Sequence, residues 1–173
     1  MTKKEFLKAV SNGRIDVLQI FLDTIINLDV AYCVIGGLAV NAYAEPVVSL
    51  DLAIVVVAED IDRVCNALGK FFKVEQFAHS VNLNSSKSDL RIQLQTDSRY
   101  QAFIQRAMPH QVLGYDMRVA SVEDVLKGKI WAYSDEQRRK SKRQKDLADI
   151  LRLIEAYPDL EASLPDSIRK KIE

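Results

Sequence analysis

Hydrophobic residues recur with two different periods along this chain, and together these periods predict a mixed α/β fold. The helical period predicts helices over residues 3–11, 14–28, 60–71, 99–107 and 121–133. Short apolar runs predict strands over residues 31–35, 50–57, 81–83, 90–95 and 117–120, with another near Val74. A longer helix is expected over residues 135–157, because Ser134 and Gln137 form a capping-box pattern and Pro158 ends the helix.

Length and composition favour one domain over residues 1–173. A chain of 173 residues with 48% hydrophobic content can bury a sizeable core. We expect N-terminal helices over 1–28, a sheet core over 30–120 and a C-terminal helical part over 121–173, with a small extra helix after Pro165.

Paired glycines stand where the first predicted strand ends. Gly36 and Gly37 follow an apolar strand and precede a helical turn over residues 38–44. Backbone N–H groups at such a junction carry positive partial charge, and glycine allows a phosphate to approach them closely. The alternative is that these glycines form a tight turn that binds no ligand.

An acidic residue begins the next strand. Side chains alternate between the faces of a strand, so Asp51 and Ala53 share one face. A carboxylate in an apolar strand must be solvated, paired or bound to a cation. Two carboxylates spaced in this way could hold Mg²⁺, but only one is present. The alternative is that Asp51 is a solvated residue that caps the turn after Ser49.

The order of motifs resembles a known superfamily. Gly36-Gly37, thirteen intervening residues and Asp51 are similar to the Gly-Gly/Ser and Asp-x-Asp pattern of the DNA polymerase β-like nucleotidyltransferases. The downstream half resembles the AbiEii/AbiGii toxin-type branch, in its residues 121–125 (Ser-Val-Glu-Asp-Val), Lys129 and residues 142–149 (Lys-Arg-Gln-Lys-Asp-Leu-Ala-Asp). The resemblance implies an α/β (α+β) nucleotidyltransferase fold, in which helices flank a mixed sheet and further helices follow at the C-terminus.

The resemblance also implies a nucleotide-binding role for particular residues. Gly36 and Gly37 would hold a nucleoside triphosphate through their backbone amides. Lys129 would lie near the phosphates and offset charge that develops on the leaving pyrophosphate. Lys142 and Lys145 would bind the triphosphate from the last long helix.

A catalytic set is implied in the same way. Asp51 would be a Mg²⁺ ligand, and Asp146 would position either the acceptor hydroxyl or Lys129. For Asp149 we favour a structural role, as a helix-surface ion-pair partner of Lys145.

Two positions depart from the superfamily pattern. Ala53 replaces the second aspartate, and Gln93 stands where a third carboxylate is expected. Asp89 lies roughly 13 Å from Gln93 along an extended strand, so it does not substitute without a shift in register. We therefore expect weak metal-dependent transfer. The sequence is compatible with a native alanine at position 53 and with a substituted aspartate.

Charge shapes the remaining predictions. Lys and Arg together equal Asp and Glu at 24 each, so any affinity for RNA must be local. Six cations within residues 138–145 are either a solvated helix surface or a binding patch, in which Arg138 and Arg139 contact an RNA backbone. Trp131 and Tyr133 could stack a base, although a tryptophan at this spacing is more often core.

The leading hypothesis is transfer of a nucleoside monophosphate from a nucleoside triphosphate to a hydroxyl of RNA such as tRNA, protein or a small molecule. Mg²⁺ is the implied cofactor, and toxin–antitoxin membership with a cognate antitoxin partner follows from the resemblance. The alternatives are a catalytically inactive nucleotide- or protein-binding regulatory module and an RNA-binding protein that uses the basic patch. Two cysteines in apolar segments and no membrane-spanning run suggest a cytoplasmic protein without a membrane partner.

Overall fold

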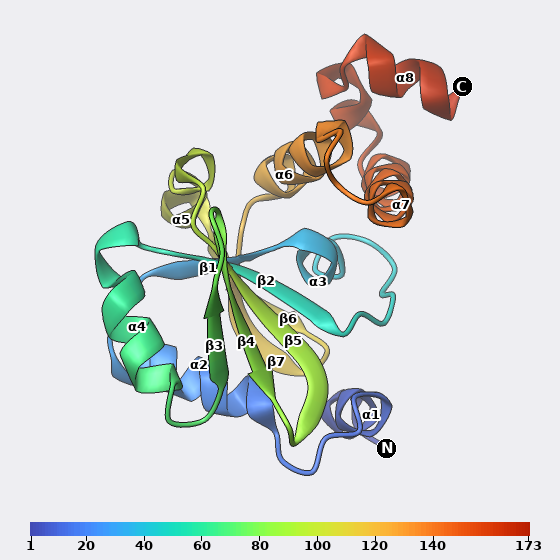
Figure 1. The fold of residues 1–173 in the computed structure, drawn as a ribbon. Helices are drawn as coiled ribbons and strands as arrows, with labels where there is room; N and C mark the ends of the chain where they lie inside the picture. The colour runs from blue at the N-terminus through green and yellow to red at the C-terminus, as the bar shows by residue number, and fades with distance from the viewer.

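Seven strands form one mixed sheet in the computed structural model, which describes all of residues 1–173 (Figure 1). The strand order is β3-β4-β5-β2-β1-β7-β6. The pairs β1–β7 and β2–β5 are parallel, and the other neighbours are antiparallel. The strands are β1 Tyr32–Ile35, β2 Asp51–Val56, β3 Lys73–Gln76, β4 Ser80–Ser85, β5 Ser88–Gln95, β6 Met108–Val112 and β7 Tyr115–Val119.

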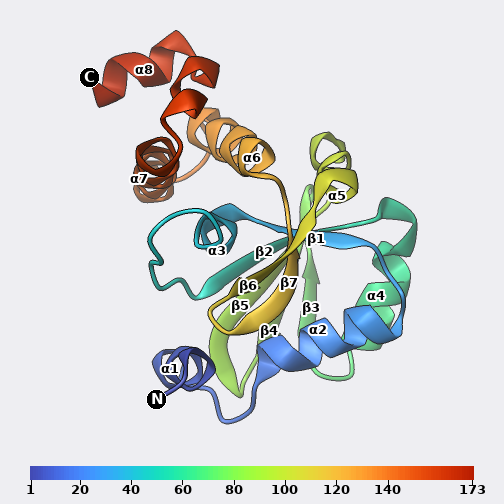
Figure 2. The same ribbon diagram turned by 180° about the vertical axis from the view of Figure 1, so that it is seen from behind.

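Helices lie on both sides of this sheet. In Figures 1 and 2, α2 and α4 lie on one side, whereas α6, α7 and α8 stand on the opposite side. The helices are α1 Lys3–Val10, α2 Val17–Asn27, α3 Gly36–Val40, α4 Ile61–Leu68, α5 Phe103–Arg106, α6 Val122–Ser134, α7 Lys140–Ala156 and α8 Asp166–Ile172. Short 3-10 turns cover Ala58–Asp60, Ser98–Tyr100 and Pro158–Ser163. The predicted α/β class is confirmed.

Strand alternation explains how the sheet presents polar groups on one face. In β5 the buried side chains Leu90, Ile92 and Leu94 alternate with exposed Arg91 and Gln93. The apolar set joins the core, because burying these side chains removes apolar surface from water. The polar set is left on the face that looks toward α7.

Register places the two central strands in contact at their polar positions. In the parallel pair of β2 and β5, Asp51 is opposite Arg91 and Ala53 is opposite Gln93. In the antiparallel pair of β1 and β2, Ile35 is opposite Ala53. The glycine turn after β1 therefore lies beside position 53.

The long helix predicted over 135–157 begins later than expected. Ser134 is the last residue of α6, and α7 begins at Lys140, so the capping-box prediction was wrong. The Asp135 carboxylate instead accepts a hydrogen bond from the Gln137 backbone N–H at 3.0 Å, which makes a tight turn. Arg143 donates to the Tyr133 carbonyl at 2.7 Å and satisfies the end of α6. These local bonds separate the two helices.

A hairpin strand was not predicted. β6 pairs with β7 through a turn at Leu113 and Gly114, whose φ angles are 49° and 84°. Two consecutive left-handed residues make the tight turn that joins twisted antiparallel strands. The helix predicted over 99–107 is shorter, and divides into the turn Ser98–Tyr100 and α5. No helix combines the length and apolarity needed to cross a bilayer.

Candidate active site

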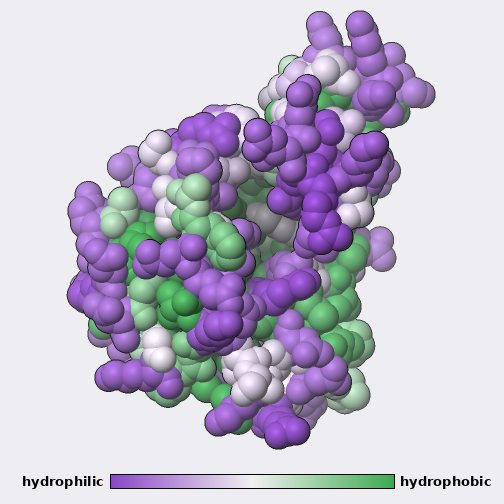
Figure 3. All heavy atoms as spheres, viewed as in Figure 1, coloured by the Kyte–Doolittle hydropathy of each residue, from purple (hydrophilic) through white to green (hydrophobic).

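A cavity of about 500 Å³ lies between the polar face of the sheet and the start of α7. Hydrophilic side chains gather over α7 and around the hollow beside it in the space-filling view (Figure 3). The walls are mostly polar. They include both glycines, Asp51, Ala53, Asn82, Asn84, Arg91, Gln93, Lys129, Gln137, Arg138, Arg139, Lys142, Lys145 and Asp146. Every residue predicted for the site thus lines one cavity.

The glycine turn is shaped for close approach. Gly36 has a φ of +75°, which residues with a side chain rarely adopt. A Cβ added at Gly36 would lie 3.2 Å from the Cβ of Ala53, so the turn and position 53 face each other across a small gap. At Gly37 a Cβ would meet only the Asp149 carboxylate, at 3.6 Å.

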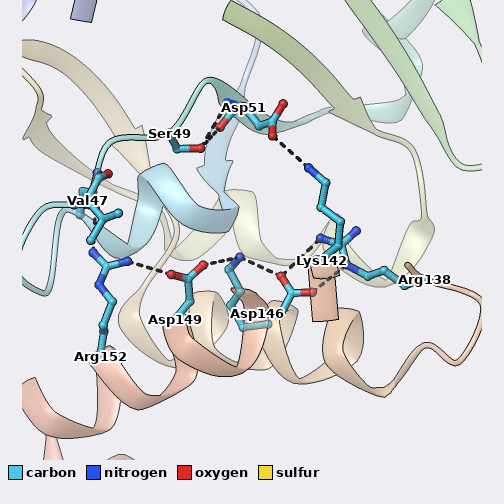
Figure 4. A network of polar contacts seen from close by, with 10 residues as sticks. Val47, Ser49, Asp51, Arg138, Lys142, Asp146, Asp149 and Arg152 are labelled. Atoms are coloured by element: carbon cyan, nitrogen blue, oxygen red, sulfur yellow. Dashed lines mark hydrogen bonds and ion pairs between the residues drawn. The ribbon is translucent and has the colours of Figure 1, made fainter. Parts of the chain in front are cut away.

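Asp51 is held by two cations. Its Oδ1 accepts from Arg91 Nε at 2.7 Å. Its Oδ2 accepts from Lys142 Nζ at 3.1 Å, the contact drawn in Figure 4. Ser49 Oγ accepts from the Asp51 backbone N–H at 3.2 Å, so the Ser49 hydroxyl, and not the Asp51 carboxylate, caps this turn. Burial pushes the pKa of Asp51 upward, but the hydrogen bond and charge of Lys142 and those of Arg91 outweigh it and lower the pKa. The carboxylate is therefore ionised and paired.

The donor set around Asp51 does not fit a pair of Mg²⁺ ions. Ala53 and Gln93, the two positions aligned with missing carboxylates, are neighbours in register and both line the cavity. Mg²⁺ prefers carboxylate oxygens, and here both oxygens of the one available carboxylate already bind cationic side chains. Asp89 lies elsewhere, where it accepts from Asn12 Nδ2 at 2.6 Å, as its distance along the strand predicted.

A buried chain of ion pairs forms the floor beneath the cavity. Lys129 Nζ lies 3.1 Å from Asp146 Oδ1 and 2.7 Å from Asp149 Oδ2, and all three residues are buried. Arg138 Nε binds Asp146 Oδ2 at 2.7 Å, and Arg152 binds Asp149 Oδ1 at 2.8 Å. Figure 4 shows Asp146, Asp149 and Arg152 along α7, with Lys142 reaching toward Asp51. Each buried charge is thus matched by an opposite charge.

Asp149 differs from its prediction. We expected it on the helix surface as a partner of Lys145, but it is 4% exposed and pairs with Lys129 and Arg152. The reason is the helix phase, since Asp146 and Asp149 share the face of α7 that meets α6, whereas Lys145 is exposed and lines the cavity.

The basic cluster divides according to its place around α7. Arg138, Lys142 and Lys145 line the cavity together with Arg139, whereas Lys140 does not. Arg138 is committed to Asp146, so of the two residues predicted to contact RNA only Arg139 makes no ion pair.

The two aromatic candidates are packed against protein groups. Trp131 stacks on Phe103 with ring centroids 5.6 Å apart, and the Arg99 guanidinium lies 4.8 Å from its ring. Arg143 lies 5.3 Å from the Tyr133 ring. This arrangement favours the structural interpretation of Trp131.

Sequence reasoning missed Arg91, Asn82 and Asn84 as cavity residues. Strand alternation places Arg91 on the polar face of β5, but only the register of β2 against β5 brings it to Asp51. Asn82 pairs with Gln93 in the antiparallel register of β4 and β5. Strand alternation could have shown that these residues lie on the polar face of the sheet. It could not show the strand register, which brings them to the cavity.

A family profile described as the nucleotidyl transferase AbiEii toxin of the type IV toxin–antitoxin system matches residues 41–173. The chain belongs to the AbiEii family. The matched region contains Asp51, Lys129 and Asp146, and it begins after Gly36 and Gly37. Comparison with curated protein sequences gives no significant match.

Solved structures of nucleotidyltransferases and nucleotidyltransferase-like proteins share the fold of this AbiEii family member. The complex of ANT(2")-Ia with adenylyl-2"-tobramycin aligns with a TM-score of 0.64 at 14% identity, over 91% of this chain and 97% of that one. The lincomycin-bound lincosamide antibiotic adenylyltransferase LnuA aligns with a TM-score of 0.57 at 13% identity, over 82% and 98%. An antigenic nucleotidyltransferase-like protein from Paracoccidioides brasiliensis aligns with a TM-score of 0.54 at 18% identity, over 88% and 77%. At these identities the likeness establishes the nucleotidyltransferase fold.

Proposed function

We propose that the cavity binds a nucleoside triphosphate and that the site is built for transfer of its nucleoside monophosphate to a hydroxyl, with transfer held to a low rate by Ala53 and Gln93. The observation that carries this proposal is the position of Asp51, the one carboxylate that the sheet contributes to a cationic cavity beside the glycine turn. AbiEii membership and the fold support the reaction class.

The relatives suggest what kind of acceptor such a site takes. ANT(2")-Ia is described with an adenylyl group on tobramycin, and LnuA is described as an adenylyltransferase of lincosamide antibiotics. In such a reaction the acceptor oxygen bonds to the α-phosphorus, the bond to pyrophosphate breaks and the hydroxyl loses its proton. For this chain the acceptor class stays open between RNA such as tRNA, a protein and a small molecule.

The residues of the cavity would share the work as follows. The backbone amides of the glycine turn and the side chains of Lys142 and Lys145 would bind the phosphates, and Lys129 would offset charge on the departing pyrophosphate. Asp146 would act as a positioning residue, because it holds Lys129 and Arg138 at 3.1 and 2.7 Å. Asp51 would be the candidate carboxylate to accept the proton of the acceptor hydroxyl.

A gain-of-function experiment tests the proposal. The wild type, Ala53→Asp and Ala53→Asp with Gln93→Asp are incubated with each labelled nucleoside triphosphate, Mg²⁺ and bulk tRNA. We expect the double variant to transfer label at least about a hundredfold faster than the wild type, since restored carboxylates supply several kcal/mol of transition-state stabilisation. Asn84→Asp is the matched control, because it adds a carboxylate to the same wall away from position 53.

The products also distinguish the alternatives. Label on the tRNA or on the protein itself identifies the acceptor class. Triphosphate binding without transfer in any variant would favour the nucleotide-binding regulatory module, for which the pairing of Asp51 with two cations is the specific support. No binding and no transfer in any folded variant would overturn the proposed function. A cognate antitoxin partner is a further proposal from the AbiEii family and would be sought by co-purification.

A further inference from the structure

Two cationic side chains meet at the carboxylate where a metal site would begin. Arg91 comes from the neighbouring strand, in register with Asp51, and Lys142 reaches it from α7 across the cavity. Both side chains are partly exposed, at 62% and 37%, so they can turn from Asp51 toward a ligand in the cavity. Each is also a phosphate binder by chemistry, the guanidinium through paired N–H groups and the ammonium as a point charge.

The charge of the cavity exceeds what its carboxylates neutralise. Six cationic side chains and two carboxylates line it, which leaves an excess of four positive charges. Lys129 and Arg138 pair with Asp146 and keep one of these charges. The other three lie with Arg91, Arg139, Lys142 and Lys145 once Asp51 is counted. Such a surface suits a fully ionised triphosphate better than one whose charge Mg²⁺ has partly neutralised.

The uncharged residues beside Asp51 also favour a ligand without a metal ion. At the two positions beside Asp51 where carboxylates would complete a metal site, Ala53 offers no donor and Gln93 offers an uncharged amide. No group of three histidine, cysteine, aspartate or glutamate side chains gathers anywhere in the chain. A phosphate chain at this wall would therefore meet N–H donors and positive charge in place of carboxylates.

We propose that Arg91 and Lys142 take the place of the metal ions, and that the cavity binds a nucleoside triphosphate that carries no divalent cation. This inference rests on the proposed nucleotide site and specifies the ionic form of its ligand. Asp51 holds the two cations in place until the triphosphate arrives, and it competes with the phosphates for them.

Isothermal titration calorimetry with ATP, in EDTA and in excess Mg²⁺, tests the proposal on the folded wild-type chain. We expect binding about tenfold or more tighter in EDTA, because Mg²⁺ removes charge that the cavity would otherwise pair. Binding that requires Mg²⁺ would overturn this inference and leave the proposed nucleotide site standing. Absence of binding under both conditions would overturn both.

Two substitutions sharpen the result. Arg91→Gln should weaken ATP binding in EDTA about tenfold or more. The control is Arg14→Gln, which should not change binding, because Arg14 is exposed, makes no ion pair and lies outside the cavity. Asp51→Asn should tighten binding in EDTA, because it frees both cations. A metal-binding role for Asp51 predicts the reverse, so loss of affinity in Asp51→Asn would contradict the proposal, with circular dichroism confirming that each variant is folded.

Discussion

Replacing Lys129 by methionine should destabilise the chain, because it removes a buried ammonium from a cluster of ion pairs. The ammonium lies 3.1 Å from Asp146 and 2.7 Å from Asp149, and its side chain is 8% exposed. Methionine keeps most of the lysine stem and its packing, so the main loss is the charge. Two buried carboxylates would then share only the outer arginines.

The size of the effect follows from the burial of this cluster. Removing one partner from a buried ion pair costs up to about 3–5 kcal/mol. That figure is an upper bound here, because Arg138 still pairs with Asp146 and Arg152 with Asp149. Domains of ordinary stability have only about 5–15 kcal/mol in total. At about 2–4 °C per kcal/mol for a chain of this size, the midpoint of thermal unfolding should fall by up to roughly 20 °C.

Urea and thermal unfolding followed by circular dichroism measure this prediction. The matched control is Lys145→Met, since Lys145 lines the same cavity but is exposed and unpaired, and its change should cost less than about 0.5 kcal/mol. If the two lysine variants unfold at the same urea concentration, the ion-pair account of this cluster is refuted.

Three other predictions concern the turn, the segment after α3 and a buried thiol. Gly36→Ala should cost about 1–2 kcal/mol in urea unfolding because of its left-handed backbone, whereas Gly37→Ala should be close to neutral. Arg152→Ala should speed amide hydrogen exchange between α3 and β2, since Arg152 donates to that segment at 2.6 and 2.8 Å; unchanged exchange there would contradict this role. Burial raises the pKa of the Cys33 thiol to about 12 from an ordinary value of 9.0, so the unfolded chain ionises first and stability should fall as the pH rises above 9.0. Cys33→Ala should flatten that fall in a series of unfolding curves.

The site was predictable where its signal is local. Gly36 and Asp51 are each adjacent to a strand whose period is readable, and the alternation of β2 places Ala53 on the same face as Asp51. The order of the motifs then predicted that Lys129 and Asp146 lie in the same cavity. A family pattern can predict such contacts between distant residues, whereas periodicity alone cannot.

What could not be predicted depends on register and on helix phase. Arg91 meets Asp51 only because β2 and β5 pair in parallel across an intervening stretch of 31 residues, and no local pattern specifies that alignment. The break before α7 depends on the local turn at Asp135 and on the hydrogen bond from Arg143 to the Tyr133 carbonyl, which forms only once the two helices are in place. The same break sets which face of α7 is buried. Asp149 therefore lies in the core, although it was predicted on the surface.

The most direct test of the nucleotide site is a map of backbone amide shifts in ¹H–¹⁵N spectra as ATP is added in EDTA. The account predicts that the largest shifts fall on Gly36, Gly37 and Asp51 and on the start of α7. Shifts confined to another lysine-rich hollow, such as the one lined by Lys70, Lys73 and Lys87, would contradict it, as would a spectrum that ATP leaves unchanged.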